Sequence, residues 1–66
     1  MPRPKLAELT RAERGVLGGL LRGLSLRRIA ADRGTSPATV GHQAESIYRK
    51  LGVHSRSELV ALFAGG

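Results

Sequence analysis

Arginine and lysine side chains stand on both sides of one short segment of this 66-residue chain, residues 37–50. Arg27 and Arg28 precede the segment, whereas Arg49 and Lys50 end it. The whole chain has 11 Lys and Arg against 5 Asp and Glu, a formal net charge of +6. Such an excess of positive charge points to a polyanionic partner, most often a nucleic acid and less often an anionic membrane.

The arrangement of these cations favours the binding of phosphate groups. Four charges that served only solubility would have no reason to bracket the same segment. Hydroxyl groups lie within it as well, and hydroxyls are common donors to phosphate oxygens. The side chains predicted to contact phosphates are therefore Arg27, Arg28, Thr39, Ser46, Arg49 and Lys50.

Other chemistries lack the residues that they need. The chain has no cysteine and only two histidines, so disulfides, thiolate metal sites and a structural zinc are not expected. Three of the serines stand at predicted helix starts, and no Gly-x-Ser-x-Gly elbow is present. A catalytic pocket also needs a longer chain. We predict that the protein is not an enzyme and needs no metal or cofactor.

The segment between the cations has the pattern of an amphipathic helix. Ser36 is a typical N-cap, and Pro37 suits the first helical position because its missing N–H needs no partner there. Apolar residues then recur every three or four positions: Val40, Ala44, Ile47 and Leu51. A helix over 37–50 is predicted, with Gly52 as its stop. Its opposite face holds Ala38, Gly41, His42, Glu45 and Arg49.

A shorter helix over 26–33 precedes this segment. Ser25 caps its start and Gly34 ends it. Only Gly34 and Thr35 separate the two helices, a turn short enough to force them to cross steeply. Two short helices joined in this way, the second with a polar outer face, form the helix-turn-helix that reads DNA.

An N-terminal helix over 11–22 begins at Thr10 and Glu13, which have the spacing of a capping box. Leucine and valine side chains form an apolar stripe along it. Three glycines interrupt the pattern: Gly15, Gly18 and Gly19. Each destabilises a helix interior by about 1 kcal/mol relative to alanine. We expect this helix to be the least stable of the fold, with its glycines offset by close packing against a neighbour.

A C-terminal helix over 56–64 starts after Ser55, which with Glu58 has the spacing of a second capping box. Apolar residues lie on more than one side of this helix, so a small core cannot cover them all. We expect a symmetric contact between two chains to cover the remaining apolar residues. The side chains predicted to form this dimer contact are Leu59, Leu62 and Phe63.

Together these helices predict an all-α fold, a four-helix bundle that contains a helix-turn-helix. Residues 1–8, with two prolines and basic neighbours, are expected to be a basic N-terminal arm or a linker remnant, and residues 9–66 the domain. No apolar run approaches the roughly 18 residues that span a bilayer, and the start lacks a signal-peptide pattern. The protein is expected in the cytoplasm, on the nucleoid.

The sequence resembles the LuxR-type (GerE-like) helix-turn-helix domain over about residues 9–63. The resemblance rests on Leu9-Thr10-x-x-Glu13-x-x-Val16-Leu17, Gly23-Leu24-Ser25, Ile29-Ala30, Gly34, Ser36, Thr39-Val40 and a highly specific closing run from Ser46 to Glu58. It implies a four-helix domain of a bacterial regulator that binds promoter DNA, usually as a homodimer through the fourth helix. In that family a receiver or ligand-sensing domain is commonly linked to the helix-turn-helix.

The resemblance places Gly41, His42 and Glu45 where family members reach base edges. Gly41 replaces a frequent Lys and has no side chain, so the usual electrostatic anchor is missing. His42 is expected to contact a phosphate or a base, as a donor to guanine N7 or O6, although a solvated surface position suits it too. Glu45 either accepts from cytosine N4 or orients Arg49 through an i, i+4 pair.

Gln43 is a further departure, because the family usually has His at this position. It flanks the apolar face of the predicted helix, so we expect its amide to contact the DNA backbone rather than an adenine edge. Arg33 and Thr35 replace an aliphatic pair around the turn, which predicts a turn that is less well buried.

These observations predict sequence-specific binding of double-stranded DNA by a transcriptional regulator or its C-terminal effector domain. The helix at 37–50 would lie in the major groove, and a homodimer would place two such helices about 34 Å apart on an inverted repeat. Region four of a sigma factor is one alternative, which the run from Tyr48 to Arg56 disfavours. The other, motivated by Gly41, Gln43 and Glu45, is a degenerate helix-turn-helix that pairs with another regulator and inhibits it.

Overall fold

The computed structural model describes residues 6–64, and every regular element in that range is a helix. A short 3-10 helix, η1, precedes four α-helices: η1 (Leu6–Glu8), α1 (Arg11–Leu21), α2 (Leu26–Arg33), α3 (Pro37–Leu51) and α4 (Arg56–Ala64). The predicted all-α fold is confirmed, and each α-helix ends within one residue of its predicted bounds. η1 is an addition to the predicted elements. The other residues of the predicted N-terminal arm, 1–5, lie outside the described range.

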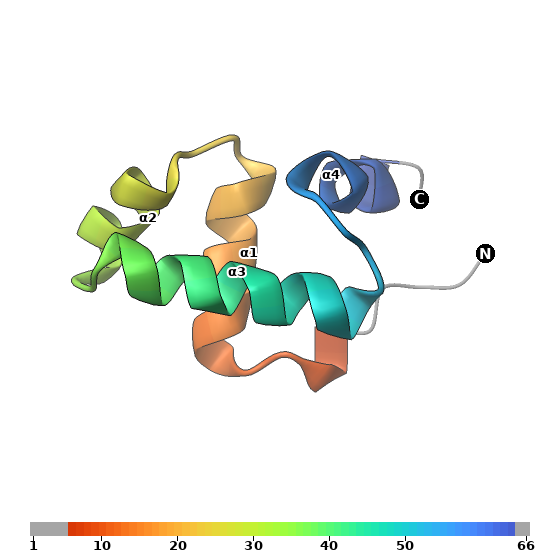
Figure 1. The fold of residues 1–66 in the computed structure, drawn as a ribbon, viewed down its shortest axis with the longest axis horizontal. Coiled ribbons are helices and arrows are strands. Elements are labelled where there is room, and N and C mark those ends of the chain that lie inside the picture. Colours follow the sequence, from red (N-terminus) through yellow and green to blue (C-terminus); the bar gives the residue numbers. More distant parts are fainter. Residues whose placement is uncertain (1–5, 65–66) are drawn as a thin grey trace.

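The long helix α3 is central to the arrangement and lies in front of α1 in Figure 1. It packs against both α1 and α2, while α4 packs against α1 and α3. In this view α2 (yellow-green) and α4 (blue) lie above the two ends of α3. None of the other helices within residues 6–64 crosses the side of α3 that faces the viewer.

Local hydrogen bonds start the first three α-helices as the sequence predicts. Thr10 Oγ1 accepts from the N–H of Glu13 at 3.1 Å, and Glu13 Oε1 accepts from the N–H of Thr10 at 2.9 Å, which completes the capping box. Ser25 Oγ and Ser36 Oγ each accept from a backbone N–H three residues later, at 3.1 and 3.2 Å. These caps satisfy N–H groups that a helix start leaves without a partner.

The turn between α2 and α3 depends on Gly34. Its φ of +67° lies in the left-handed region, where a residue with a Cβ is strained. The N–H of Thr35 then donates to the carbonyl of Ala30 at 2.9 Å and closes the end of α2. The chain therefore enters α3 almost at once, as a helix-turn-helix requires. Arg33 and Thr35 are both exposed, which confirms the prediction of an open turn.

The start of α4 differs from the predicted capping box in one bond. Ser55 Oγ accepts from the N–H of Glu58 at 3.1 Å, as the box requires. However, Glu58 Oε1 accepts from the N–H of His54 at 2.9 Å and not from that of Ser55. The acidic side chain therefore caps the loop one residue earlier, and the same oxygen lies 3.4 Å from His54 Nδ1.

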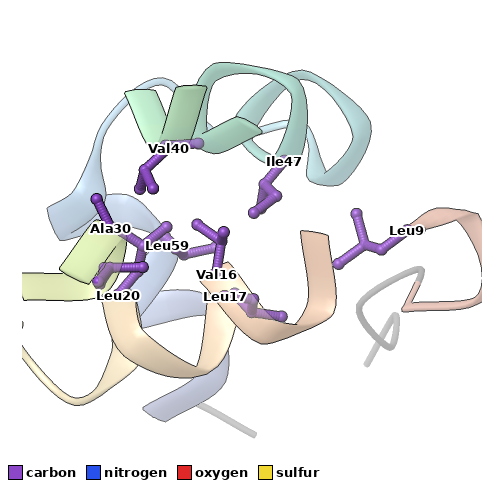
Figure 2. Packing of buried hydrophobic residues seen from close by; sticks show 10 residues of the cluster. Leu9, Val16, Leu17, Leu20, Ala30, Val40, Ile47 and Leu59 are labelled. Carbon is purple, nitrogen blue, oxygen red and sulfur yellow. The ribbon is translucent and has the colours of Figure 1, made fainter. Parts of the chain in front are cut away.

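One apolar core joins all four α-helices (Figure 2). Its most deeply buried side chains are Val16, Leu20, Val40, Ile47 and Leu59. Leu59 is 0% exposed within a single chain, so it has no surface to offer a second one. We therefore remove Leu59 from the predicted dimer contact, because its role is to anchor α4 to the rest of the bundle.

Two of the three glycines in α1 lie against a neighbour, as predicted. A Cβ added to Gly19 would lie 2.7 Å from Cγ1 of Ile29, a distance that requires movement of α1 or α2. At Gly15 an added Cβ would overlap the guanidinium group of Arg33. Gly18 is different, because a Cβ there would meet nothing within 4 Å. Close packing therefore offsets the weak helix propensity of Gly19, whereas at Gly15 the neighbour is the flexible end of an exposed arginine and at Gly18 there is none.

Candidate nucleic-acid interface

The uncovered side of α3 carries the residues predicted to read bases. The opposite side is fixed in the core by three buried residues: Val40, Ala44 and Ile47. His42, Glu45 and Arg49 are exposed, and their spacing of three and four residues places them on one face of the helix. Gly41 lies beside them and is half-buried. The structure thus brings the predicted base-reading positions to one surface.

A shallow hollow lies beside this surface, where Gly41 provides no side chain. Its volume is about 660 Å³, and its lining includes Leu26 from α2 and Pro37, Ala38, Gly41 and Glu45 from α3. A Cβ added to Gly41 would lie 3.9 Å from Cδ1 of Leu26, an ordinary van der Waals distance. The first residue of α2 therefore reaches the base-reading side of α3, which the sequence pattern did not indicate.

The N-terminal part of α2 carries two exposed cations. Arg27 and Arg28 are both solvent-accessible, in keeping with their predicted role as phosphate contacts. Arg28 Nε lies 3.2 Å from a carboxylate oxygen of Asp32 in an i, i+4 pair on the helix surface. Such exposed pairs contribute only about 0.3–0.5 kcal/mol, so the guanidinium group can exchange Asp32 for a phosphate at little expense.

A buried carboxylate connects α1 to α3. Glu13 is only 6% exposed, and its two oxygens accept hydrogen bonds from α3. Lys50 Nζ lies 2.7 Å from Oε1, and Ser46 Oγ donates to Oε2 at 2.6 Å. The hydrogen bonds from Lys50, from Ser46 and from the Thr10 N–H lower the pKa of Glu13 from 4.5 to about 2, against the opposing effect of burial. The Glu13 network, defined here as Glu13 with Thr10, Ser46 and Lys50, thus fixes α3 on α1.

This network changes the roles of two predicted phosphate contacts. The one hydroxyl proton of Ser46 is donated to Glu13, so it is not available to a phosphate. We therefore replace the predicted phosphate contact of Ser46 by a positioning role. Lys50 has three ammonium protons and is 33% exposed in its side chain, so protons remain for a second acceptor. The sequence pattern predicted the bond between Thr10 and Glu13 but gave no signal for the bonds from Ser46 and Lys50, because these residues are more than thirty positions from Glu13.

Thr39 and Gln43 differ in what they can offer to DNA. Thr39 is exposed, and its Oγ1 accepts from Ser36 Oγ at 3.0 Å, which leaves its own hydroxyl proton free to be donated. Gln43 is half-buried, and within residues 6–64 its enclosed Oε1 has no hydrogen-bond donor. Phosphate oxygens only accept hydrogen bonds, so a backbone contact of Gln43 has to use its Nε2 protons.

Arg56 is a structural cation that the sequence analysis did not identify. Its Nη2 donates to the carbonyls of Leu20, at 2.9 Å, and of Leu24, and its Nε lies 3.2 Å from the Leu20 oxygen. These carbonyls belong to the C-terminal end of α1 and the loop after it, where helix carbonyls lack partners and cations are favoured. Arg56 is thus used inside the fold and is not counted among the phosphate contacts.

The outer surface of α4 remains apolar after Leu59 has been assigned to the core. Val60 is 41% exposed, and Leu62 and Phe63 are half-buried. Phe63 packs against the edge of the core, whereas Leu62 does not belong to that cluster. Leu62 and Phe63 therefore remain candidates for a contact between two chains, with Val60 as an exposed neighbour.

Two other kinds of site find no support between residues 6 and 64. None of the helices described there combines the length and the apolar character that crossing a membrane requires. Within the same residues, no three or more acidic or histidine side chains gather where they could hold a metal ion.

Comparison with known proteins agrees with this geometry. The family model described as "Bacterial regulatory proteins, luxR family" matches residues 7–63. The chain is 44% identical over 55 residues to "Transcriptional regulatory protein YdfI" of Bacillus subtilis (strain 168), an alignment that covers 83% of this chain and 26% of that protein. It is 40% identical over 62 residues to "Probable HTH-type transcriptional regulator GfsR" of Streptomyces halstedii, which covers 94% of this chain and 25% of that protein. The chain thus spans about a quarter of the length of these relatives.

Proposed function

This chain belongs to the luxR family of bacterial regulatory proteins, and we propose that it binds double-stranded DNA with α3 in the major groove. The observation that carries the proposal is the uncovered face of α3. Its exposed side chains include His42, Glu45 and Arg49, while its opposite face is locked in the core. An α-helix of this kind fits the width of the major groove, where base edges present donors and acceptors.

The proposed contacts divide into two groups. Arg27, Arg28, Thr39, Arg49 and Lys50 contact phosphates, with Gln43 as a further donor through Nε2. His42 and Glu45 read base edges, and Gly41 allows the backbone of α3 to approach closely. Phosphate contacts position the helix and supply most of the affinity, whereas the base contacts discriminate between sequences.

We also propose that the DNA-binding form is a homodimer through α4, with Leu62 and Phe63 in the contact. The apolar outer surface of α4 supports this proposal. A twofold axis at α4 would place the two α3 helices about 34 Å apart, on half-sites one turn of duplex apart. The proposed location is the bacterial cytoplasm, on the nucleoid, where the chain acts as the DNA-binding part of a transcriptional regulator. A linked receiver or sensor domain would supply the signal.

Selection of bound oligonucleotides from a random duplex pool tests this function. We expect an enriched inverted repeat, and fluorescence anisotropy with the enriched duplex should give a dissociation constant that rises steeply with salt. The slope of the logarithm of the association constant against the logarithm of the salt concentration should be about −0.9 for each phosphate contacted. Absence of duplex binding at low ionic strength would contradict the proposal.

A second candidate function is that of a protein-interaction module that pairs with another regulator through α4 and blocks it. Two observations favour it: Gly41 has no side chain, and Glu45 places a negative charge on the face of α3 that would meet DNA. Such a module would form a stable complex through α4 but retain little duplex at low salt. The anisotropy experiment therefore separates the two candidates. The match to the luxR family makes region four of a sigma factor the weaker alternative.

A further inference from the structure

Leu26 is an unusual residue for the surface of a short basic helix. It occupies the first position of α2, is 37% exposed, and is followed directly by Arg27 and Arg28. Its side chain does not point into the core but leans toward α3, where Cδ1 lies 3.9 Å from the position of a Cβ on Gly41. At 37% exposure, part of this leucine side chain is accessible to a partner.

Three small or apolar residues belong to the lining of the hollow beside α3. Leu26 contributes from α2, and Ala38 and Gly41 contribute from the first turns of α3. The lining of the same hollow also includes residues with hydrogen-bonding groups: His42, Glu45, Tyr48 and Arg56. Because Gly41 has no side chain, position 41 itself does not cover Leu26. The surface therefore has a local apolar patch between polar base-reading positions.

We infer that Leu26, together with Ala38 and Gly41, contacts the 5-methyl group of a thymine in the major groove. This inference rests on the DNA binding proposed above, and it extends the sequence preference to a residue outside α3. The thymine methyl is the apolar feature among the base edges of the major groove, and proteins recognise it by apolar contact. A leucine side chain beside an unobstructed glycine provides such a contact.

The charges around the patch favour DNA over an apolar segment of a protein. Arg27 and Arg28 follow Leu26 in α2, and Arg49 lies on the exposed face of α3. A neutral peptide that filled the hollow would offer no negative charge to Arg27 or Arg49, whereas Arg28 would keep its pair with Asp32. A duplex instead places its phosphates against the arginines when a base edge meets Leu26. A longer side chain at position 41 would have to pass over Leu26, so glycine at this position keeps the patch accessible.

Replacement of single thymines by deoxyuridine tests this inference, because it removes only the methyl group. Each thymine of the selected duplex is replaced in turn, and affinities are measured for the wild type, Leu26→Ala and Leu6→Ala. Leu6 is a matched control, since it is also an exposed leucine but lies in η1, away from the lining of the hollow. Far-ultraviolet circular dichroism checks that all three proteins retain the same helix content.

We expect one thymine in each half-site at which deoxyuridine weakens binding by the wild type about fourfold, the ratio that corresponds to burial of one methyl group. Leu6→Ala should show the same ratio. Leu26→Ala should bind the thymine and deoxyuridine duplexes with equal affinity. That affinity should match the one that the wild type has for the deoxyuridine duplex.

Three results would overturn the inference. The first is binding by the wild type that does not change with deoxyuridine at any position. The second is an equal loss of affinity on replacement of thymine by deoxyuridine for the wild type and for Leu26→Ala. The third is loss of self-association by Leu26→Ala in sedimentation, with no effect of deoxyuridine, which would assign the hollow to a second copy of the chain. Failure of every duplex to bind is a separate outcome, because it removes the proposed function itself.

Discussion

Glu13→Gln should destabilise the domain in a way that depends on pH. The substitution keeps the size of the side chain but removes the negative charge of the carboxylate, which accepts hydrogen bonds from Lys50 and Ser46. In the folded protein the pKa of Glu13 is lowered from 4.5 to about 2. Each pKa unit corresponds to about 1.36 kcal/mol, so the ionised carboxylate contributes about 3 kcal/mol to the free energy of unfolding at neutral pH. Domains of this size are stable by only roughly 3–10 kcal/mol.

The pH dependence follows from the direction of the shift. Because the folded protein holds Glu13 ionised more strongly than the unfolded chain does, the contribution is fully present above the unfolded pKa of 4.5. It is lost as the pH falls from 4.5 toward 2, where the carboxyl group becomes protonated in the folded protein as well. The free energy of unfolding of Glu13→Gln should therefore be lower than that of the wild type by about 3 kcal/mol at pH 7, and by much less at pH 2.5.

Urea unfolding followed by circular dichroism at several pH values measures this difference. Glu45→Gln is the matched control, because Glu45 is exposed on α3 and lies outside the Glu13 network. Its effect on stability should stay within about 0.5 kcal/mol, as for most surface substitutions. A Glu13→Gln effect that is equally large at pH 7 and pH 2.5 would show that the loss comes from packing and not from the charge. An effect no larger than that of Glu45→Gln would refute the role of the network.

Three further predictions concern binding, assembly and α1. Arg49→Ala should weaken binding to all duplexes about equally and reduce the salt slope by about 1 in anisotropy titrations; a change of sequence preference alone would contradict the phosphate contact. Leu62→Asp should convert dimers to monomers in analytical ultracentrifugation, and an unchanged dimer mass in a folded variant would remove this residue from the proposed contact. Gly18→Ala should raise the free energy of unfolding by about 1 kcal/mol because a Cβ there meets open space. Gly19→Ala should lower it, since its Cβ would lie 2.7 Å from Ile29; equal effects of the two substitutions would contradict this packing.

Local sequence signals predicted the helices because the interactions that start and end a helix involve neighbours in the chain. Thr10 and Glu13 are three residues apart, and their capping box forms as expected. Gly34 needs only its own backbone freedom to end α2, and its positive φ follows from that. The same logic was incomplete for Glu58, because the N–H of His54 is also within reach of its carboxylate and takes the bond.

Features that depend on tertiary contacts could not be predicted from neighbouring residues in the sequence. Leu59 and Leu62 are both leucines of one short helix, and only the position of α4 on the bundle decides that Leu59 is buried. Glu13 has a sufficient local role as the third residue of a capping box. Nothing in the sequence indicated that its second oxygen binds Ser46, thirty-three residues away.

Net charge overstates how much of this chain is available to DNA, because the fold divides its cations between two uses. Lys50 is paired with the buried Glu13, and Arg56 caps the carbonyls at the end of α1. Arg49, one residue before Lys50, points to the exposed face of α3 instead. The buried residues Val40, Ala44 and Ile47, together with the contact of Lys50 with Glu13, set the rotation of α3 about its axis and leave Arg49 exposed. Lys50 is still one-third exposed, so it can hold α3 on α1 and also reach a phosphate in the proposed complex, whereas Arg56 is used inside the fold.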